Sequence, residues 1–212
     1  MDEPPRHSHK LAPDDVIRRK VKAELRKRIR GLRATTPADA CAARSAKLVA
    51  RLEALPAVVA AKAVALFWPI VEKHEVDLRA LDASLRARGV RVAYPSIDPA
   101  TREMCFRVVA STGDLAERGF GFAEPPAEAA LCARGDLDVV VVPAIAISPD
   151  GHRIGYGAGF YDRTLPTVAP PAVLVGVAFD FQLLAEVPAT EGDVAVDIVV
   201  TDTRVLTVSA ST

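Results

Sequence analysis

The chain has few cysteines and no net charge. Cys41, Cys105 and Cys132 are its three cysteines, and 27 basic residues balance 27 acidic ones. Because the cysteines are odd in number, widely spaced and without a C-x-x-C pair, neither a disulfide framework nor a zinc site is predicted. We interpret them as buried, inert thiols in a reducing cytosol. A neutral chain also has no global attraction for nucleic acid or for an acidic membrane surface.

Two kinds of hydrophobic segment are missing as well. The first ten residues are polar and contain no apolar core, so a secretory signal is not predicted. No uninterrupted apolar run reaches the length of a membrane span. These absences predict a cytoplasmic protein with no membrane partner. Half of the residues are nonetheless hydrophobic, which is enough for a full core.

The length of 212 residues favours one domain. Residues 1–13 are polar and contain prolines, so we expect them to form a disordered tail. Residues 14–212 are expected to form a single domain. Its first helix is expected to begin at Asp14 and Asp15, because acidic residues are favoured in a first helical turn.

Strand-like and helical patterns alternate along the rest of the chain. Apolar runs that indicate strands cover residues 62–68, 90–94, 104–109, 138–147, 173–179 and 198–201. Helical patterns cover residues 37–55 and 78–88, and a short helix after residue 160 is expected to break at Pro166. This alternation predicts the α/β class, with a mostly parallel sheet covered on both faces. The run 104–109 is expected at an edge of that sheet.

The most informative segment is the glycine-rich stretch 150–163, which follows the buried run 138–147. It contains Gly151, Gly155, Gly157 and Gly159 between Arg153 and Arg163. A glycine loop at the end of a buried strand is a typical phosphate site, since its backbone N–H groups can approach an anion closely. The arginines add charge and paired donors. Tyr161 and Asp162 add a hydroxyl and a carboxylate, and carboxylate oxygens are ligands that Mg²⁺ prefers.

Two commoner glycine motifs do not fit this stretch. The dinucleotide fingerprint needs its third glycine where Phe160 stands, and a P-loop needs Gly-Lys-Ser/Thr where Phe160, Tyr161 and Asp162 follow. A structural turn with a surface Arg–Asp pair is the alternative interpretation. The arginines, Tyr161 and Asp162 favour the phosphate site over this alternative.

The first helix is strongly basic, with nine Lys and Arg residues between Arg18 and Arg33 against one acid, Glu24. A solvated basic face is the default interpretation, and non-specific RNA contact is a second one. Lys22 and Arg26 are four residues apart, so both lie on one side of the helix and can hold a polyphosphate together. They lie beside an apolar stripe that consists of Ile17, Val21, Leu25, Ile29 and Leu32.

In combination these motifs resemble the 5-formyltetrahydrofolate cyclo-ligase family, also called methenyltetrahydrofolate synthetases. Residues 151–163 are similar to the family signature G-x-R-L-G-x-G-x-G-Y-Y-D-R, which is highly specific. Weaker matches follow the order of the family at residues 22–26 (K-x-x-L-R), 75–78 (E-V-D-T), 119–125 (G-x-x-G-I-x-E-P), 142–146, 178–182 and 193–197. The resemblance therefore extends from about residue 22 to residue 201.

The resemblance implies a three-layer α/β/α sandwich around a mostly parallel sheet. The implied activity is the ATP- and Mg²⁺-dependent conversion of 5-formyltetrahydrofolate to 5,10-methenyltetrahydrofolate, with release of ADP and phosphate. Phosphorylation of the formyl oxygen would create a leaving group, and N10 of the folate would close the ring. The protein would contribute positioning and charge neutralisation. We expect a monomer with a small-molecule substrate and no nucleic-acid partner.

The resemblance also implies individual site residues. The implied ATP-binding residues are Lys22, Arg26, Arg153, Ile154, Gly155, Tyr156, Gly157, Ala158, Gly159, Phe160 and Tyr161. The implied substrate-binding residues are Ile70, Glu75, Tyr156 and Phe160. The implied metal ligands are Asp162 and Asp193, and the implied catalytic residues are Arg153 and Tyr161. Phe67, Trp68 and Phe122 are candidates for covering the flat ring, although plain core is the favoured interpretation of Phe67 and Trp68.

Alternative interpretations also exist for two of the implied site residues. For Glu75 the alternative is a residue at the start of a helix. For Asp193 the alternative is a residue in a turn. His74 and His152 match no functional position of the family and are expected on the surface.

The chain departs from the family pattern at several positions, which are Leu78 for threonine, Ala144 for glycine, Ile147 and Ser148 for Phe-Asp, Phe160 for tyrosine and Gly192 for histidine. None of these departures removes a charged ATP ligand. Two alternatives stay open on these grounds. One is an ATP-using enzyme on the same scaffold that acts on another small heterocycle, and the other is a non-enzymatic nucleotide- or RNA-binding module. The neutral charge, and the absence of aromatics interleaved along the basic helix, weigh against RNA.

Overall fold

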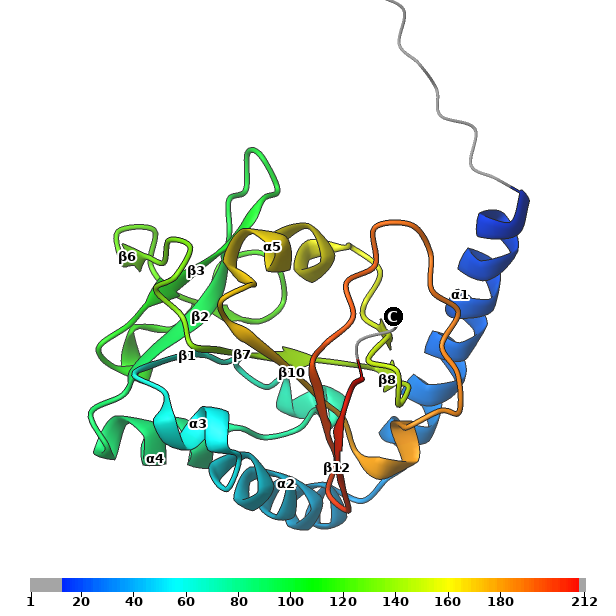
Figure 1. The fold of residues 1–212 in the computed structure, drawn as a ribbon, viewed down its shortest axis with the longest axis horizontal. Coiled ribbons are helices and arrows are strands. Elements are labelled where there is room, and N and C mark those ends of the chain that lie inside the picture. Colours follow the sequence, from blue (N-terminus) through cyan, green and yellow to red (C-terminus); the bar gives the residue numbers. More distant parts are fainter. Residues whose placement is uncertain (1–12, 210–212) are drawn as a thin grey trace, which may run out of the picture.

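The computed structural model describes residues 13–209, and its centre is an eight-stranded sheet (Figure 1). The strand order is β12-β11-β10-β7-β1-β2-β3-β6. The strands are β1 (Ala63–Ala65), β2 (Arg91–Ile97), β3 (Met104–Val108), β6 (Ala130–Leu131), β7 (Val139–Pro143), β10 (Val173–Val177), β11 (Ile198–Val200) and β12 (Val205–Thr207). All pairings from β11 through β10, β7 and β1 to β2 are parallel, and the outer pairings are antiparallel.

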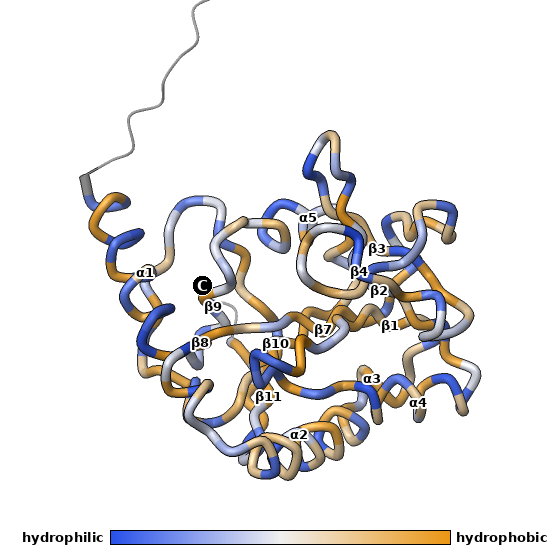
Figure 2. Tube along the Cα trace, turned by 180° about the vertical axis from the view of Figure 1, so that it is seen from behind, coloured by the Kyte–Doolittle hydropathy of each residue, from blue (hydrophilic) through white to orange (hydrophobic). Residues whose placement is uncertain are grey.

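Helices cover both faces of the sheet. One face carries α2 (Ala38–Glu53), α3 (Pro56–Ala60) and α4 (Arg79–Ala87), and the other carries α5 (Phe160–Val168). Strand β7 is apolar on both faces, because successive side chains of a strand point to opposite sides. Its Val139 and Val141 pack with side chains of α2 and α4, and its Val140 and Val142 pack with those of α5. Figure 2 shows the central strands as a largely hydrophobic layer. The predicted α/β/α sandwich with a mostly parallel sheet is confirmed.

Helix α1 (Pro13–Ala34) stands beside these layers, next to β8 (Figure 1). Its first turn contains Asp14 and Asp15, as predicted. The apolar stripe packs only in part: Ile29 is 5% exposed, whereas Ile17 is 60% and Val21 is 42% exposed. The side of α1 that faces the protein contains the buried cations Lys22 and Arg33. Leu25 and Ile29 pack on a small apolar cluster with Ile145, Ile154 and Val187, while Lys22 and Arg33 line a cavity at the end of the sheet.

The prediction of one strand over residues 138–147 is wrong. Strand β7 ends at Pro143, and the chain then forms a separate hairpin of β8 (Ala146–Ile147) and β9 (Arg153–Ile154). Proline has no N–H to donate to a sheet, which makes Pro143 a natural end for a central strand. The hairpin places the glycine loop directly after β9 instead of directly after the central strand.

Two smaller predictions are also wrong. Helix α5 does not break at Pro166 but continues to Val168, with Leu165 fully buried and Thr164 donating a hydrogen bond to the Met104 carbonyl. Tertiary anchoring therefore outweighs the one helical hydrogen bond that the proline removes. Strand β3 is not an edge strand, because β6 pairs along its outer side.

The remaining short elements lie in the connections. They are η1 (Val71–Lys73), η2 (Thr112–Asp114), β4 (Ala116–Glu117), β5 (Ala123–Glu124) and η3 (Asp180–Gln182). Among residues 13–209, no helix is long and apolar enough to cross a membrane. The predicted tail lies outside the described residues except for Pro13, so the proposed domain division and the cytoplasmic location stay predictions.

The connections place a crevice at one edge of the sheet. Strand β1 leads through α4 to β2 on one side, and β7 leads through α5 to β10 on the other side. The order of the strands therefore reverses between the neighbours β1 and β7. In open α/β sheets, ligands bind outside the carboxyl ends of the strands at such a reversal.

Candidate active site

A cavity of about 910 Å³ lies at this carboxyl edge, within the size range of ligand pockets. Segments that follow parallel strands form its floor, with Phe67 and Trp68 after β1 and Ala144 and Ile145 after β7. The glycine loop and one side of α1 form its walls. Residues from four distant parts of the chain thus meet where the topology predicts a binding site.

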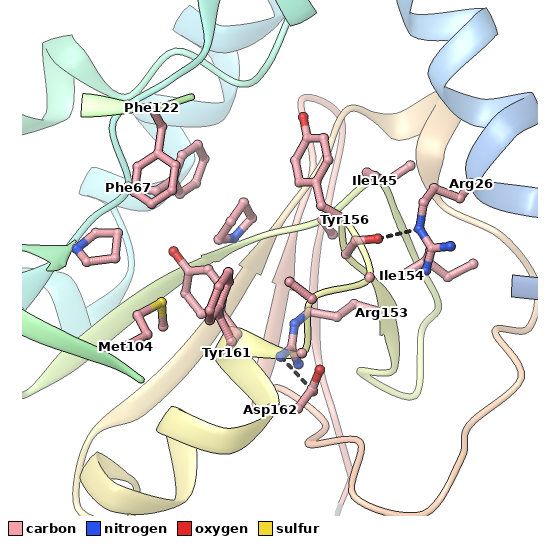
Figure 3. Close-up of a pocket in the computed structure, with 18 of the residues that line it drawn as sticks. Arg26, Phe67, Met104, Phe122, Ile145, Arg153, Ile154, Tyr156, Tyr161 and Asp162 are labelled. Carbon is pink, nitrogen blue, oxygen red and sulfur yellow. Dashed lines mark hydrogen bonds and ion pairs between the residues drawn. The ribbon is translucent and has the colours of Figure 1, made fainter. Parts of the chain in front are cut away.

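The glycine loop joins β9 to α5 and needs two of its glycines for their backbone conformation. Gly157 has φ of +103° and Gly159 has φ of +68°, which side chains of L-residues rarely tolerate. The loop is held from both sides. Arg26 of α1 donates from Nε to the Gly155 carbonyl at 2.8 Å, which Figure 3 shows, and Arg163 of α5 donates to the Ala158 carbonyl at 3.0 Å.

Arg153 and Asp162 face each other across the loop (Figure 3). Arg153 is 8% exposed, and its Nη2 donates to Asp162 Oδ1 at 2.9 Å. Arg153 also donates to the Val194 carbonyl, while the Val194 N–H donates to Asp162 Oδ1. Burial lowers the pKa of Arg153, and the nearby Asp162, Tyr161 and Asp193 oppose that shift. Arginine stays protonated in proteins, so the pocket contains a fixed, partly dehydrated cation.

A second ion pair, between the buried Lys22 and the partly exposed Asp193, lies at the same end of the cavity. Lys22 Nζ donates to Asp193 Oδ2, which also accepts from the Thr190 N–H at 2.6 Å and from the Thr190 hydroxyl at 3.0 Å. Burial on its own raises the pKa of Asp193, but the hydrogen bonds from Lys22 and Thr190 bring it below its ordinary value. The carboxylate is therefore ionised at neutral pH.

The donor set at this end fits Mg²⁺ that binds together with a nucleotide. In residues 13–209, the hydrogen bonds of Asp162 use Oδ1 and those of Asp193 use Oδ2, which leaves one carboxylate oxygen of each residue without such a bond. No group of three metal-ligating side chains occurs in this part of the chain. Mg²⁺ commonly takes one or two carboxylates and completes its shell with phosphate oxygens and water.

The other end of the cavity contains a hydrogen-bonded chain of three side chains. Arg33 Nη2 donates to the Tyr156 hydroxyl at 2.8 Å, and this hydroxyl donates to Glu75 Oε1. Glu75 Oε2 accepts from the Ile70 N–H at 2.8 Å, which closes the loop after β1. Burial, and next the charge of Glu75, raise the pKa of Tyr156 to about 12, so its hydroxyl stays protonated. Glu75 lies outside α4 and is not a helix-start residue.

Apolar side chains cover the space between these two ends. Figure 3 shows Phe67 and Phe122 close together, with Met104 and Tyr161 on the neighbouring wall. Phe120 packs edge-on against Phe160, with ring centroids 6.2 Å apart. Burial raises the pKa of Tyr161 well above its usual value, so Tyr161 offers a neutral hydroxyl. A flat ring fits such walls, because aromatic faces prefer offset or edge-to-face contacts.

Comparison with known proteins identifies the family. The sequence profile of the 5-formyltetrahydrofolate cyclo-ligase family matches residues 18–202. The chain belongs to this family. An Escherichia coli protein named 5-formyltetrahydrofolate cyclo-ligase is 32% identical over 158 residues, which cover 73% of this chain and 86% of that protein. A protein of the same name from Mycolicibacterium smegmatis is 44% identical over 97 residues, covering 43% of this chain and 48% of that protein.

Solved structures of cyclo-ligase relatives agree with the fold. The NMR structure of Aquifex aeolicus 5,10-methenyltetrahydrofolate synthetase has a TM-score of 0.79 at 32% identity, covering 91% of this chain and 95% of that one. The Mycoplasma pneumoniae 5,10-methenyltetrahydrofolate synthetase has a TM-score of 0.69 at 25% identity, covering 85% of this chain and 98% of that one. The resemblance that the motifs indicated is thereby confirmed.

The structure brings together all the site residues that the cyclo-ligase motifs implied, since each of them lines the cavity. Phe67, Trp68 and Phe122 line it as well. His74 and His152 do not, and His74 bonds instead to the Arg33 carbonyl at 3.2 Å. Sequence reasoning missed further lining residues, among them Arg33, Lys73, Pro95, Arg102, Met104, Phe120, Gln182 and Thr190. Arg33 carried a usable signal, because it lies two helical turns after Arg26 on the same side of α1.

The departures from the cyclo-ligase pattern lie in different places. Leu78 is 1% exposed and belongs to the core under α4, so its replacement of threonine concerns packing. Ala144, Phe160 and Gly192 line the cavity. Gly192 has φ of +85° and no atom within 4 Å of where a Cβ would be, so the cavity is open at that point.

Proposed function

We propose that this cavity is the active site of an ATP-dependent 5-formyltetrahydrofolate cyclo-ligase. As a member of the family, the chain converts 5-formyltetrahydrofolate to 5,10-methenyltetrahydrofolate. The observation that supports this site most strongly is that the residues implied for ATP, for the folate and for Mg²⁺ line one cavity at the carboxyl edge of the sheet. We also propose a cytoplasmic enzyme that acts as a monomer.

ATP binds at the glycine-loop end of the cavity. The backbone from Ile154 to Tyr161 surrounds the phosphates, and the buried cations Lys22 and Arg153 neutralise them. Arg26 fixes the loop through the Gly155 carbonyl and adds a third positive charge. Asp162 and Asp193 would hold Mg²⁺, which would neutralise phosphate charge when bound.

The folate ring binds between the apolar walls and the Glu75 end. Glu75 is fixed by the Ile70 N–H and the Tyr156 hydroxyl, and its carboxylate accepts hydrogen bonds from donor groups of the pterin. Ile70, Tyr156 and Phe160 shape this end of the cavity. The formyl group then lies toward the glycine loop, within reach of the γ-phosphate.

The chemistry proceeds in two displacements. The formyl oxygen attacks the γ-phosphorus, and the bond from that phosphorus to the ADP oxygen breaks. N10 then attacks the formyl carbon and loses its proton, and the carbon–oxygen bond breaks as phosphate leaves. Arg153 stabilises the charge on the transferred phosphoryl group, and the neutral Tyr161 hydroxyl donates to its oxygens. The apolar walls exclude water that would otherwise compete with N10.

The direct test combines the purified protein with ATP, Mg²⁺ and 5-formyltetrahydrofolate and follows the absorbance of the methenyl product. We expect product to form with all three components, at a rate proportional to enzyme, together with one ADP per product. Samples without ATP, or with a chelator in place of Mg²⁺, serve as controls. ATP hydrolysis without a methenyl signal would instead indicate an enzyme that acts on a different heterocycle.

A further inference from the structure

Gln182 is a buried side chain at the cavity that the mechanism above does not use. It ends η3, lines the cavity and is 1% exposed. Its Nε2 donates to the Ile145 carbonyl at 2.7 Å and to the Ala144 carbonyl at 3.3 Å. Its Oε1 accepts from the Phe179 N–H at 3.0 Å. Both donor hydrogens of the amide thus have backbone partners, so the side chain holds the backbone rather than a ligand.

The amide joins the segments that follow two neighbouring strands of the sheet. Strand β7 leads into Ala144 and Ile145, and β10, which pairs with β7, leads into η3. A buried carbonyl that lacks a partner costs free energy comparable to a lost hydrogen bond. Gln182 therefore ties the floor of the cavity to the end of β10 through two carbonyls at once.

The backbone of Ile145 connects this restraint to the glycine loop. Its carbonyl accepts from Gln182, and its N–H donates to the Ile154 carbonyl at 2.7 Å. Ile154 ends β9, and the glycine loop begins with the next residue, Gly155. Figure 3 shows Ile145 and Ile154 close together at this point. Two successive hydrogen bonds thus lead from the Gln182 amide to the start of the proposed phosphate loop.

The hairpin that precedes the glycine loop is short and needs support from outside. Strands β8 and β9 have two residues each and form a sheet separate from the eight-stranded one. A two-stranded hairpin is at best marginally stable alone. The Leu184 N–H donates to the Ile147 carbonyl at 2.8 Å, and the Val196 N–H donates to the Gly151 carbonyl at 3.0 Å. These bonds hold β8 and the turn, whereas Gln182 acts at the open end, where the glycine loop starts.

We propose that Gln182 is a positioning residue for ATP. Through Ile145 it fixes the start of the glycine loop, and with it the backbone N–H groups that surround the phosphates and the end of β9, which carries Arg153. Donors that are held in place before the ligand binds stabilise phosphate charge without the cost of reorganisation. This inference rests on the proposed function and adds to it a residue outside the glycine loop and outside α1.

The variant Gln182→Met removes the amide and keeps an unbranched side chain of similar length. Steady-state kinetics give the KM for ATP and for 5-formyltetrahydrofolate, and calorimetric titration gives the Kd for ATP. The matched control is Thr201→Val. Thr201 is fully buried, lies outside the cavity and donates to Asp180 Oδ1 of η3 at 2.8 Å. The control therefore disturbs η3 and leaves the hydrogen bonds to Ala144 and Ile145 in place.

We expect Gln182→Met to raise the KM and the Kd for ATP by about tenfold, the effect of one or two hydrogen bonds. The KM for 5-formyltetrahydrofolate should change by less than about threefold, which is less than one typical bond. Thr201→Val should lose stability and keep the wild-type KM for ATP. A loss of folded protein alone would lower the apparent kcat and leave both KM values unchanged, so the two effects are separable.

A second variant, Gln182→Glu, keeps the size of the side chain and the acceptor for the Phe179 N–H. The carboxyl can donate to the Ile145 carbonyl while it is protonated, and it has no donor once it is ionised. The ratio of variant to wild-type KM for ATP should therefore rise with pH, whereas the ratio for Gln182→Met should stay constant. Asp180, the charged neighbour on η3, pairs with Arg204, and its influence cancels in a ratio to wild type.

Several results would overturn the inference. A folded Gln182→Met protein with the wild-type Kd for ATP would show that the glycine loop does not depend on this amide. Equal increases in the KM for ATP and for folate would mean that Gln182 supports the cavity as a whole. An equal loss of ATP affinity in Thr201→Val would reduce the effect to the packing of η3. If Gln182→Met does not fold, a pH-independent ratio for Gln182→Glu overturns the inference instead.

Failure of the proposed function gives a different result. A wild-type protein that binds no ATP would contradict both the proposed function and this inference. A wild-type protein that binds ATP but forms no methenyl product would contradict the cyclo-ligase assignment alone. In that case the Kd for ATP of the Gln182 variants still decides whether this amide positions the glycine loop.

Discussion

Arg33 donates a hydrogen bond to the Tyr156 hydroxyl, although 123 positions separate the two residues in the sequence. The bond joins the end of α1 to the glycine loop. The same hydroxyl donates to Glu75, so the hydrogen-bonded chain extends to the loop after β1. One phenol therefore connects the three segments that form the proposed folate end of the cavity. Its raised pKa means that this connection does not change with pH in the physiological range.

The Tyr156→Phe substitution tests this connection. It removes the hydroxyl and keeps the ring and the backbone of the glycine loop. A hydrogen bond to a charged group contributes about 1.5–3 kcal/mol, so the KM for 5-formyltetrahydrofolate should rise by roughly tenfold or more. The KM for ATP should stay within about twofold, which is less than the effect of one such bond. Arg33→Met should act through the same hydroxyl, so a double variant should cost less than the sum of the two single changes. Full additivity would mean that the two residues act separately.

Arg153→Ala is expected to impair ATP use. It removes a buried, charged donor from the phosphate end, which predicts a loss of roughly tenfold to a hundredfold in kcat/KM for ATP. Lys22→Ala should impair ATP use in the same direction. Arg204→Ala is a matched control, because Arg204 also pairs with an aspartate, Asp180 at 2.8 Å, but lies outside the cavity. Circular dichroism verifies the fold of each variant. Wild-type kinetics in a folded Arg153→Ala protein would contradict the proposal that Arg153 binds the phosphates of ATP.

A buried glutamate should make stability depend on pH. Glu124 is 1% exposed; its Oε2 accepts from the Ile97 N–H at 2.6 Å, while its buried Oε1 has no partner within residues 13–209. Burial raises the pKa of this carboxyl above its ordinary value of 4.5. The folded state therefore keeps the proton to a higher pH than the unfolded state, so its contribution to stability is present below pH 4.5 and is lost as pH rises through the folded pKa.

Glu124→Gln isolates this contribution. Glutamine keeps an acceptor for the Ile97 N–H and has no charge to bury, so the variant should lack this fall in stability with rising pH. Thermal unfolding at several pH values above 4.5 measures the difference between the two proteins. Glu128→Gln, at an exposed position of the same connecting segment, is the control. Parallel pH profiles of wild type and Glu124→Gln would show that Glu124 is already paired and ionised.

The sequence predicted those parts of the site that depend on local chemistry. The glycines, Arg153 and Asp162 lie within one segment, and their spacing alone indicated a phosphate loop. Pairings between distant segments were not predictable in this way. Arg33 is one of nine basic residues in the first helix. Its side chain bonds to Tyr156, which lies 123 positions later in the sequence. The exposure of Ile17 and Val21 has a related cause, because an apolar spacing does not show whether a partner surface extends that far.

Two further substitutions should separate the two ends of the cavity. Glu75→Gln keeps the size of the side chain but replaces an acceptor-only carboxylate with an amide that also carries donors. It should raise the KM for 5-formyltetrahydrofolate and leave ATP binding unchanged. Asp162→Asn keeps the shape but removes a negative charge beside Arg153 and the proposed Mg²⁺ site. It should lower kcat and raise the Mg²⁺ concentration needed for half-maximal rate, while folate binding persists.

Titration of both variants with both ligands decides between the assignments. The ATP titration is the internal control for Glu75→Gln, and the folate titration is the internal control for Asp162→Asn. Because Glu75 also accepts from the Ile70 N–H, a variant such as Ile70→Ala, which keeps that N–H, shows whether loop packing alone changes the folate KM. If Glu75→Gln binds 5-formyltetrahydrofolate as wild type does, Glu75 fixes the loop rather than the pterin. In that case the donor groups of the pterin must find their acceptors elsewhere in the cavity.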